Sequence, residues 1–286
     1  MTRRRPPRSA SADDLLTALG QLTDRVRQGA ERQKARVELA EALQRSMLPS
    51  DLPTAPGLRV AARYAPARNG LDIGGDWYDG FVLPDGSLGY SIGDVQGHDV
   101  EAAAFMGQVR IGLRAMATAI TDPGEILGRA NELLLTVDQG LFATCSFLRY
   151  DPATGELEGA RAGHVPAVCA TADGHCGIVE DEAGVPLGIL PGEVYPVTRR
   201  RLPVGGACVL VTDGVVEGPT YPVEEGLDAV AGVVRSAVMA GAQAEELASG
   251  VMEVAERSDH TDDAAVLVLL RDTDRPAAPA QRTDAG

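Results

Sequence analysis

The sequence has few of the residues that mark several common protein classes. Its 286 residues include one Trp, four His and four Cys, and only 4% of them are aromatic. No apolar run approaches the roughly 20 residues that a membrane-spanning helix requires. The basic N-terminus is not followed by the apolar stretch of a secretory signal. We therefore expect a cytoplasmic protein without a membrane segment.

Cysteine usage gives little support to a metal–thiolate site. The cysteines are Cys145, Cys169, Cys176 and Cys208. No two of them have the two-residue spacing that is typical of zinc ligands, and three lie in apolar, strand-like segments. The pattern favours small buried side chains. A zinc site that includes His164 and His175 is the alternative.

Positive charge is scarce outside the N-terminal segment. The chain has a net charge of −15, of which residues 1–45 contribute +4 and the remainder −19. An acidic surface repels the phosphate backbone of nucleic acids. The charge distribution therefore excludes nucleic acid as a partner of the main domain.

The pattern along the chain predicts one folded domain with an N-terminal extension. Residues 1–12 and 272–286 lack periodicity and are expected to be disordered tails. Residues 13–48 have helical apolar spacing with a break at Gly29. This helix either packs against its own domain or forms a short coiled coil that makes a homodimer. The main domain then covers 49–271.

Within the main domain, short strand-like runs occur in consecutive hairpins, and helical patterns occur in pairs. The strand candidates are 58–64, 77–83, 89–94, 142–150, 157–162, 167–170, 197–202, 207–212 and 265–270. Helical patterns cover 101–120 and 125–137, which Asp122-Pro123-Gly124 separates, and 226–257. This order predicts an α+β domain with antiparallel sheets and argues against a doubly wound parallel sheet.

Aspartates stand at the ends of four of these strand candidates. They are Asp76, Asp94, Asp213 and the pair Asp262-Asp263. A single Asp-Gly is usually a turn, but four strand ends that converge would gather several carboxylates. Their mutual repulsion requires cations, and an all-oxygen ligand set selects Mg²⁺ or Mn²⁺ over Zn²⁺. Spacing alone leaves turns and a metal site as alternatives.

Six motifs in order decide between these alternatives. They are GGDWYD at 74–79, GDVQGH at 93–98, AGHVP at 162–166, VPLG at 185–188, TDGVVE at 212–217 and DDAAV at 262–266. Together with LQRSMLP at 43–49 and RYAPA at 63–67, they closely resemble the bacterial PP2C-like serine phosphatases of the RsbU and SpoIIE type. The resemblance covers about residues 40 to 271.

The resemblance implies an αββα sandwich with two Mn²⁺ or Mg²⁺ ions at one end. By position, Asp76, Asp94, Asp213 and Asp262 are the catalytic metal ligands, with Asp94 bridging the ions. The Val95 backbone carbonyl assists, and Asp263 orients the ligands or exchanges roles with Asp262. The implied mechanism is attack of metal-activated water on a phosphoserine or phosphothreonine.

The sequence also departs from the family at Asp99, where the family usually has Gly. Asp99 either caps the next helix or adds a charge beside the metals. His98, His164 and His260 are either hydrogen-bonded loop residues or groups that support the site. The run 199–201, three arginines, either offsets the acidic surface for an incoming phosphoserine or is a solvated strand end.

The resemblance further implies a function in partner switching. Phosphatases of the RsbU type dephosphorylate a serine on a small STAS-domain anti-anti-sigma factor. The expected substrate is therefore a phosphorylated STAS-domain protein. The alternatives are a non-catalytic phosphatase-fold protein that recruits partners, and a hydrolase of a small phosphorylated molecule. A further hypothesis is that the helix at 13–47 dimerises or docks an activator.

Overall fold

Two antiparallel sheets stacked face to face form the centre of the molecule. The structure is a computed structural model that describes residues 12–66, 74–97, 100–137, 140–218, 221–257 and 262–272. The first sheet has the strand order β1 (Leu58–Ala65), β10 (Ala264–Arg271), β9 (Ala207–Val211), β6 (Val168–Ala170) and β7 (Cys176–Ile178). The second has the order β2 (Trp77–Val82), β3 (Leu88–Val95), β4 (Ala143–Asp151), β5 (Glu156–Ala162) and β8 (Thr198–Arg201).

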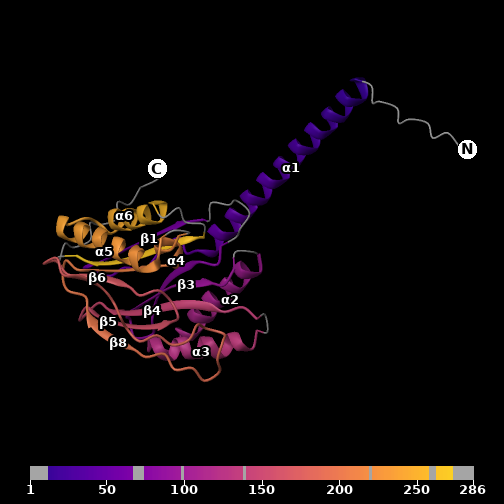
Figure 1. Ribbon diagram of the computed structural model, residues 1–286. Helices are drawn as coiled ribbons and strands as arrows, with labels where there is room; N and C mark the ends of the chain where they lie inside the picture. The colour runs from indigo at the N-terminus through magenta and orange to yellow at the C-terminus, as the bar shows by residue number, and fades with distance from the viewer. Residues whose placement is uncertain are drawn as a thin grey trace, which may run out of the picture.

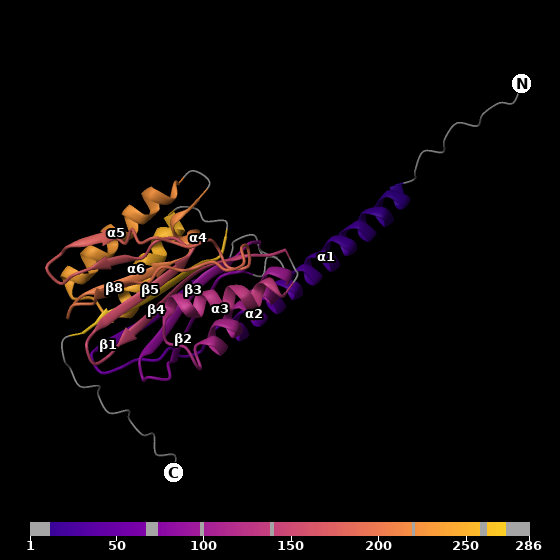
Figure 2. The same ribbon diagram turned by 90° about the horizontal axis from the view of Figure 1, so that it is seen from below.

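Helices cover both outer faces of this pair of sheets (Figures 1 and 2). On the first sheet lie α4 (Asp213–Val216), α5 (Val223–Ala240) and α6 (Ala244–Arg257), and on the second lie α2 (Val100–Met116) and α3 (Pro123–Leu135). The predicted αββα sandwich is thus confirmed, and every strand pair in both sheets is antiparallel.

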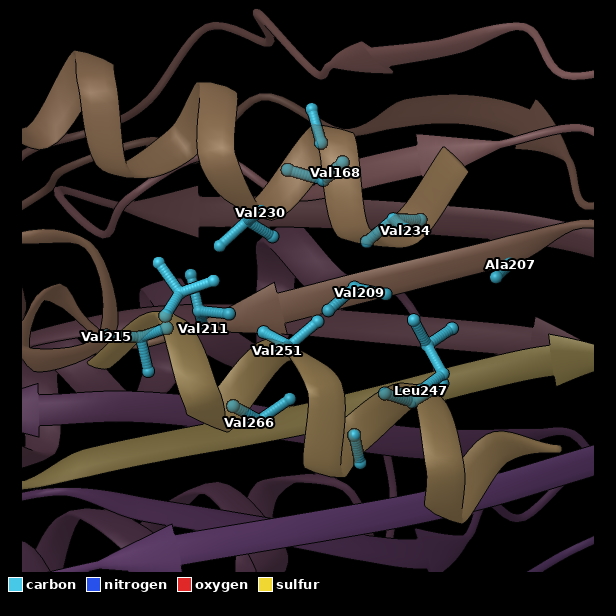
Figure 3. Close-up of a cluster of buried hydrophobic side chains, with 14 of the residues drawn as sticks. Val168, Ala207, Val209, Val211, Val215, Val230, Val234, Leu247, Val251 and Val266 are labelled. Carbon is cyan, nitrogen blue, oxygen red and sulfur yellow. The ribbon is translucent and has the colours of Figure 1, made fainter. Parts of the chain in front are cut away.

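Three layers of apolar side chains hold the sandwich together. In β10, Val266 and Val268 belong to the apolar cluster beneath α4 and α6, where Figure 3 shows Val266, whereas Leu267 and Leu269 pack between the sheets. Because both faces of the strand are covered, its sequence is continuously apolar rather than alternating. A third layer lies between the second sheet and its helices, around Trp77.

The N-terminal helix α1 (Ala12–Met47) projects from this body (Figure 1). It is continuous, so the predicted break at Gly29 is wrong; an isolated glycine costs a helix only about 1 kcal/mol. Leu19, Leu22 and Val26 are exposed by 61%, 59% and 66%. Packing of this apolar stripe against the chain's own domain, one of the two alternatives, does not occur among the residues that the structure describes.

Two further boundaries differ from the sequence prediction. The helical pattern at 226–257 is two helices, because Gly241 adopts a left-handed conformation with φ 69° and ends α5. Asp122-Pro123-Gly124 is not a linker outside the helices: Asp122 caps α3 by accepting a hydrogen bond from the Glu125 N–H at 2.8 Å, and Pro123 begins the helix. Of the predicted tails at 1–12 and 272–286, residues 1–11 and 273–286 lie outside the described residues, whereas Ala12 begins α1 and the Asp272 N–H donates to the Gly57 carbonyl at 2.9 Å. Within the described part of the chain, every helix is too short or too polar to cross a bilayer.

Candidate metal centre

Neighbouring strand ends from both sheets bring three carboxylates together. Asp76 directly precedes β2, and Asp94 lies near the end of β3, one register step beyond the Trp77–Gly93 pair. Asp213 follows β9 in the other sheet. One carboxylate oxygen from each of these three residues lies within 4.8 Å of the others. The predicted convergence of Asp76, Asp94 and Asp213 is therefore what the structure shows.

The carboxylates destabilise one another electrostatically. Burial, and then the charges of Asp94 and Asp213, raise the pKa of Asp76, which is only 2% exposed. Burial, and then Asp213, raise the pKa of Asp94 to about 8. Burial and Asp262 likewise raise the pKa of Asp213. A bound cation would remove this cost by compensating the clustered negative charge.

Gly75 leaves room for a ring of oxygens beside these carboxylates. A Cβ atom at this position would lie 2.5 Å from the Val95 carbonyl oxygen, 3.1 Å from Asp94 Oδ1 and 3.2 Å from the Gly97 carbonyl oxygen. The predicted ligand Val95 thus turns its carbonyl toward the same place as Asp94. The Gly97 carbonyl is an oxygen donor that sequence reasoning missed.

The pair at the start of β10 divides into an exposed and a buried residue. Asp262 is exposed and stands outside the three-carboxylate group, and its Oδ1 accepts a hydrogen bond from the Asp263 N–H at 2.8 Å. Asp263 is 1% exposed, and its side chain hydrogen-bonds to Tyr64. The carboxylate of Asp263 lies so close to Gly74 that a Cβ there would overlap it.

Two neutral side chains support the carboxylates and were not assigned by sequence reasoning. Tyr64, near the end of β1, has a pKa raised by burial and by Asp263, so it stays protonated as a donor. Thr212 is fully buried; its hydroxyl hydrogen-bonds to Asp76 and accepts the Ala265 N–H at 2.8 Å. In the sequence, its position immediately before Asp213 is the one sign that it lies near the carboxylates.

His164 is separated from the carboxylate group by one side chain, that of Thr144. Its Nδ1 is 2.8 Å from the Thr144 hydroxyl, and Thr144 stands opposite Asp94 in the β3–β4 ladder. Burial lowers the pKa of His164 to about 3, which keeps the ring neutral. It is therefore a buried hydrogen-bonded residue. His98, Asp99 and His260 lie outside the described residues.

The arginine run at 199–201 does not contribute to this site. Arg201 stands opposite Glu156, at the end of β5 remote from Ala162 and the carboxylates. Arg199 Nε donates to Glu158 Oε1 at 2.5 Å, and Arg200 pairs with Asp181. Two of these arginines are thus paired with carboxylates, and their strand runs toward the other end of the sheet. That the run attracts an incoming phosphoserine stays a prediction.

The donor set fits a hard divalent cation. All its donors are oxygens, from carboxylates and backbone carbonyls, which Mg²⁺ and Mn²⁺ prefer. Asp76 Oδ2 is buried and has no hydrogen-bond partner among the described residues. A buried carboxylate oxygen without a donor is costly, so coordination of a cation accounts for this atom.

A two-sheet sandwich with outer helices is the fold of the PP2C-like phosphatases. A solved structure of the RsbU and RsbW domains of Rv1364c from Mycobacterium tuberculosis has a TM-score of 0.72 and 33% identity, covering 80% of this chain and 64% of that one. The PP2C phosphatase domain of SpoIIE from Bacillus subtilis shares the fold, with a TM-score of 0.63 at 21% identity, covering 74% of this chain and 63% of that one.

The sequence gives the family. Residues 84–272 match the family model of stage II sporulation protein E, and the chain belongs to this SpoIIE family. It is also 26% identical over 185 residues to the phosphoserine phosphatase RsbU of Bacillus subtilis, across 64% of this chain. The chain spans 54% of RsbU and 32% of another relative, IcfG of Synechocystis.

Proposed function

We propose that this protein removes phosphate from a phosphoserine or phosphothreonine of a STAS-domain protein in a partner-switching pathway. The observation that carries the proposal is the group of Asp76, Asp94 and Asp213, which the two sheets hold with one carboxylate oxygen of each within 4.8 Å of the others. Membership of the SpoIIE family supports the reaction class. In this proposal residues 49–271 are the phosphatase unit, 13–48 are its helical extension, and the protein acts in the cytoplasm.

The proposed cofactor is a pair of Mn²⁺ or Mg²⁺ ions. Asp76, Asp94, Asp213 and Asp262 would hold them with the Val95 carbonyl. When bound, such ions supply an activated water and compensate charge on the phosphoryl oxygens. Asp263 is the proposed orienting residue, since Tyr64 and the backbone at Gly74 fix its carboxylate.

The chain's own contribution is to hold these oxygens in place before substrate arrives. Thr212 ties the backbone of β9 to β10 and hydrogen-bonds to Asp76 from the other sheet. Preorganised groups of this kind need no rearrangement when charge develops in the transition state. Substrate selection would then depend on docking around the site.

The relatives support the choice of a protein substrate. RsbU is named a phosphoserine phosphatase, and the Mycobacterium chain joins an RsbU domain to an RsbW domain. The resemblance of the sequence motifs to the RsbU type is what suggests partner switching. A second copy of this chain is the proposed partner of α1, because Leu19, Leu22 and Val26 are exposed, with nothing covering them in the described part of the chain.

The experiment uses the purified full chain with two substrates. Hydrolysis of p-nitrophenyl phosphate is measured with Mn²⁺, with Mg²⁺ and with EDTA, for wild type, Asp94→Asn and Asp213→Asn. Asp228→Asn, at an exposed position of α5, is the matched control. We expect metal-dependent turnover that both site variants lose and the control retains.

A phosphorylated STAS-domain protein is then supplied under the same conditions. Release of phosphate from it, at a higher kcat/KM than from p-nitrophenyl phosphate, would support the proposed substrate class. Turnover of small phosphate esters only would favour a small-molecule hydrolase. A folded protein that turns over neither substrate with any metal would favour the non-catalytic binding protein.

A further inference from the structure

Two free cysteines face each other on neighbouring strands of the first sheet. In the β6–β9 ladder Cys169 stands directly opposite Cys208, and their Sγ atoms are 2.9 Å apart. This separation is less than 1 Å longer than the sulfur–sulfur bond of about 2.05 Å. The backbone therefore already holds the two thiols at a spacing from which a bond needs only a small side-chain movement.

The other two cysteines have no such neighbour. Cys145 is fully buried in the second sheet, and burial raises the pKa of its thiol. The Cys176 thiol hydrogen-bonds to the Ala231 carbonyl at 3.3 Å, on the side of the first sheet that α5 covers. Cys169 and Cys208 instead point into the layer between the sheets.

A small cavity lies close to the pair. Ala167, two residues before Cys169, and Leu210, two residues after Cys208, line a space of about 30 Å³. Asp181 and the exposed Glu182 form part of its wall. A water molecule needs about 10–15 Å³ of such volume, so a small polar molecule can lie near the two thiols. Cys169 is itself half-buried rather than fully buried.

The surroundings of Cys169 also favour its thiolate. The contact with Cys208, and then the positive charge of Arg200, lower the pKa of Cys169 although burial acts in the opposite direction. Thiolates are the reactive form of cysteine. Cys169 is also the more exposed of the two thiols, since Cys208 is buried. Cys169 is therefore the first nucleophile, and Cys208 is the thiol that reacts second.

We propose that Cys169 and Cys208 form a reversible intramolecular disulfide when the protein meets a peroxide. The Cys169 thiolate attacks one peroxide oxygen and the O–O bond breaks, which gives a sulfenic acid and, after protonation, water. The Cys208 thiol then attacks the Cys169 sulfur, the S–O bond breaks, and a second water leaves. Two thiols lose two electrons and two protons, and the peroxide becomes two waters; a dithiol reverses the oxidation.

This bond joins β6 to the strand that leads into the metal centre. β9 ends at Val211, two residues before Asp213, and β6 pairs with β9 through only three residue pairs. A covalent link at the middle pair fixes this short ladder. The assigned site is independent of the phosphatase proposal, since it uses neither the carboxylates nor a metal.

The test counts thiols on the intact chain. Wild-type protein is treated with hydrogen peroxide, quenched with catalase, unfolded and alkylated, and then compared with a sample reduced by dithiothreitol. We expect two of the four thiols to be lost, a mass decrease of about 2 Da before alkylation, two fewer alkyl groups after it, and a peptide pair that joins Cys169 to Cys208. Dithiothreitol should restore all four thiols.

Single serine variants separate this pair from general oxidation. Cys176→Ser, the control, should lose two thiols as wild type does, whereas Cys169→Ser and Cys208→Ser should form no intramolecular link. Circular dichroism of each variant confirms that it is folded. Four intact thiols after treatment, links between chains, a bond that involves Cys176, or over-oxidised Cys169 with free Cys208 would each overturn the proposal.

Discussion

At the scale of one residue, Gly75 shows that the geometry of the proposed metal centre requires a residue without a side chain at this position. Three oxygens, from Asp94, Val95 and Gly97, occupy the space around the missing Cβ. Two of them are backbone atoms and cannot rotate away. The oxygens can face a common point only because this residue has no methyl group.

Gly75→Ala should therefore weaken metal binding without unfolding the protein. We expect at least a tenfold lower Mn²⁺ affinity and a comparable loss of phosphatase activity, because the methyl group displaces the carbonyl oxygens. Isothermal titration with Mn²⁺ checks this. Gly232→Ala is the control. Gly232 is an exposed residue of α5, and a Cβ there would have no atom within 4 Å. This substitution should stabilise the helix by about 0.5–1 kcal/mol. Equal Mn²⁺ affinity in wild type and Gly75→Ala would show that the oxygens around Gly75 do not bind the ion.

His164 gives a pH dependence at the same scale. Its pKa is about 3 in the folded protein, because the ring is buried, and about 6.5 when unfolded. Between these values the unfolded chain binds one more proton, so stability is complete above pH 6.5 and falls as the pH decreases. The expected loss is about 2 kcal/mol between pH 6.5 and pH 5.

Urea unfolding at both pH values measures this loss. His164→Gln should lose less stability on acidification than wild type, because Gln does not titrate and can still hydrogen-bond to Thr144. Thr23→Ala, on exposed α1, is a neutral control. The same pH dependence in wild type and His164→Gln would mean that other groups cause it.

At the scale of elements, α2 is fastened to the second sheet by a buried carboxylate. Asp79, in β2, is fully buried and accepts hydrogen bonds from Arg114 Nη2 at 2.5 Å and Nε at 3.2 Å. Arg110 Nε lies 3.5 Å from the same carboxylate. The Arg114 guanidinium also stacks 4.9 Å from the centre of the Phe81 ring. One aspartate thus holds two arginines from successive turns of the helix.

Asp79→Ala should destabilise the fold by about 3 kcal/mol, since it leaves two arginines without their acceptor in a mostly buried place. Arg114→Ala should cost less, about 1 kcal/mol, because that side chain is 41% exposed and Arg110 remains. Urea denaturation gives both values. A smaller effect for Asp79→Ala than for Arg114→Ala would show that the carboxylate is not the centre of this contact.

The sequence predicted most of these elements, because apolar periodicity reports burial directly. The strands with several residues per face, such as β10, were placed to within about a residue. β7 was missed, since three residues that include Gly177 are too few to show a period. The division of 226–257 depended on the left-handed Gly241, which a sequence pattern does not distinguish from a glycine inside a helix.

The candidate site was predictable in part for a related reason. Aspartates at strand ends are visible in the sequence, and the motifs singled out Asp76, Asp94 and Asp213, which the structure brings together. The roles of Tyr64 and Gly97 depend on which strand ends meet in space, and a single sequence does not contain that information. The remote position of 199–201 is likewise a consequence of the β5–β8 register.

At the scale of the whole molecule, the carboxylates come from both sheets, so cation binding should stabilise the assembled sandwich. Mn²⁺ at 100 times its dissociation constant should add about 2.7 kcal/mol to the free energy of unfolding. Differential scanning calorimetry with and without EDTA measures the shift in Tm. Asp94→Asn should abolish most of the Mn²⁺-dependent shift and Asp228→Asn should retain it. A wild-type Tm that does not respond to Mn²⁺ or Mg²⁺ would show that the carboxylates do not bind these ions in the folded protein.

The α1 stripe leads to a prediction about mass in solution. If Leu19, Leu22 and Val26 pair with a second copy, the wild-type protein is a dimer, and the double variant Leu19→Glu/Leu22→Glu is a monomer. Buried glutamates at these positions would lack partners. Light scattering after size exclusion measures both masses, with Gln28→Glu as the control. A monomeric wild-type protein would refute pairing through α1.

The length of α1 has a consequence for valency. Its 36 residues form a rod about 54 Å long at 1.5 Å per residue. Two such rods wound in parallel would carry two catalytic units on one particle, tethered at the same end. If several copies of the substrate were held in one assembly, both catalytic units could bind to it. The second binding event would then be intramolecular, and its effective concentration would be set by the length of the tether rather than by the concentration of free substrate.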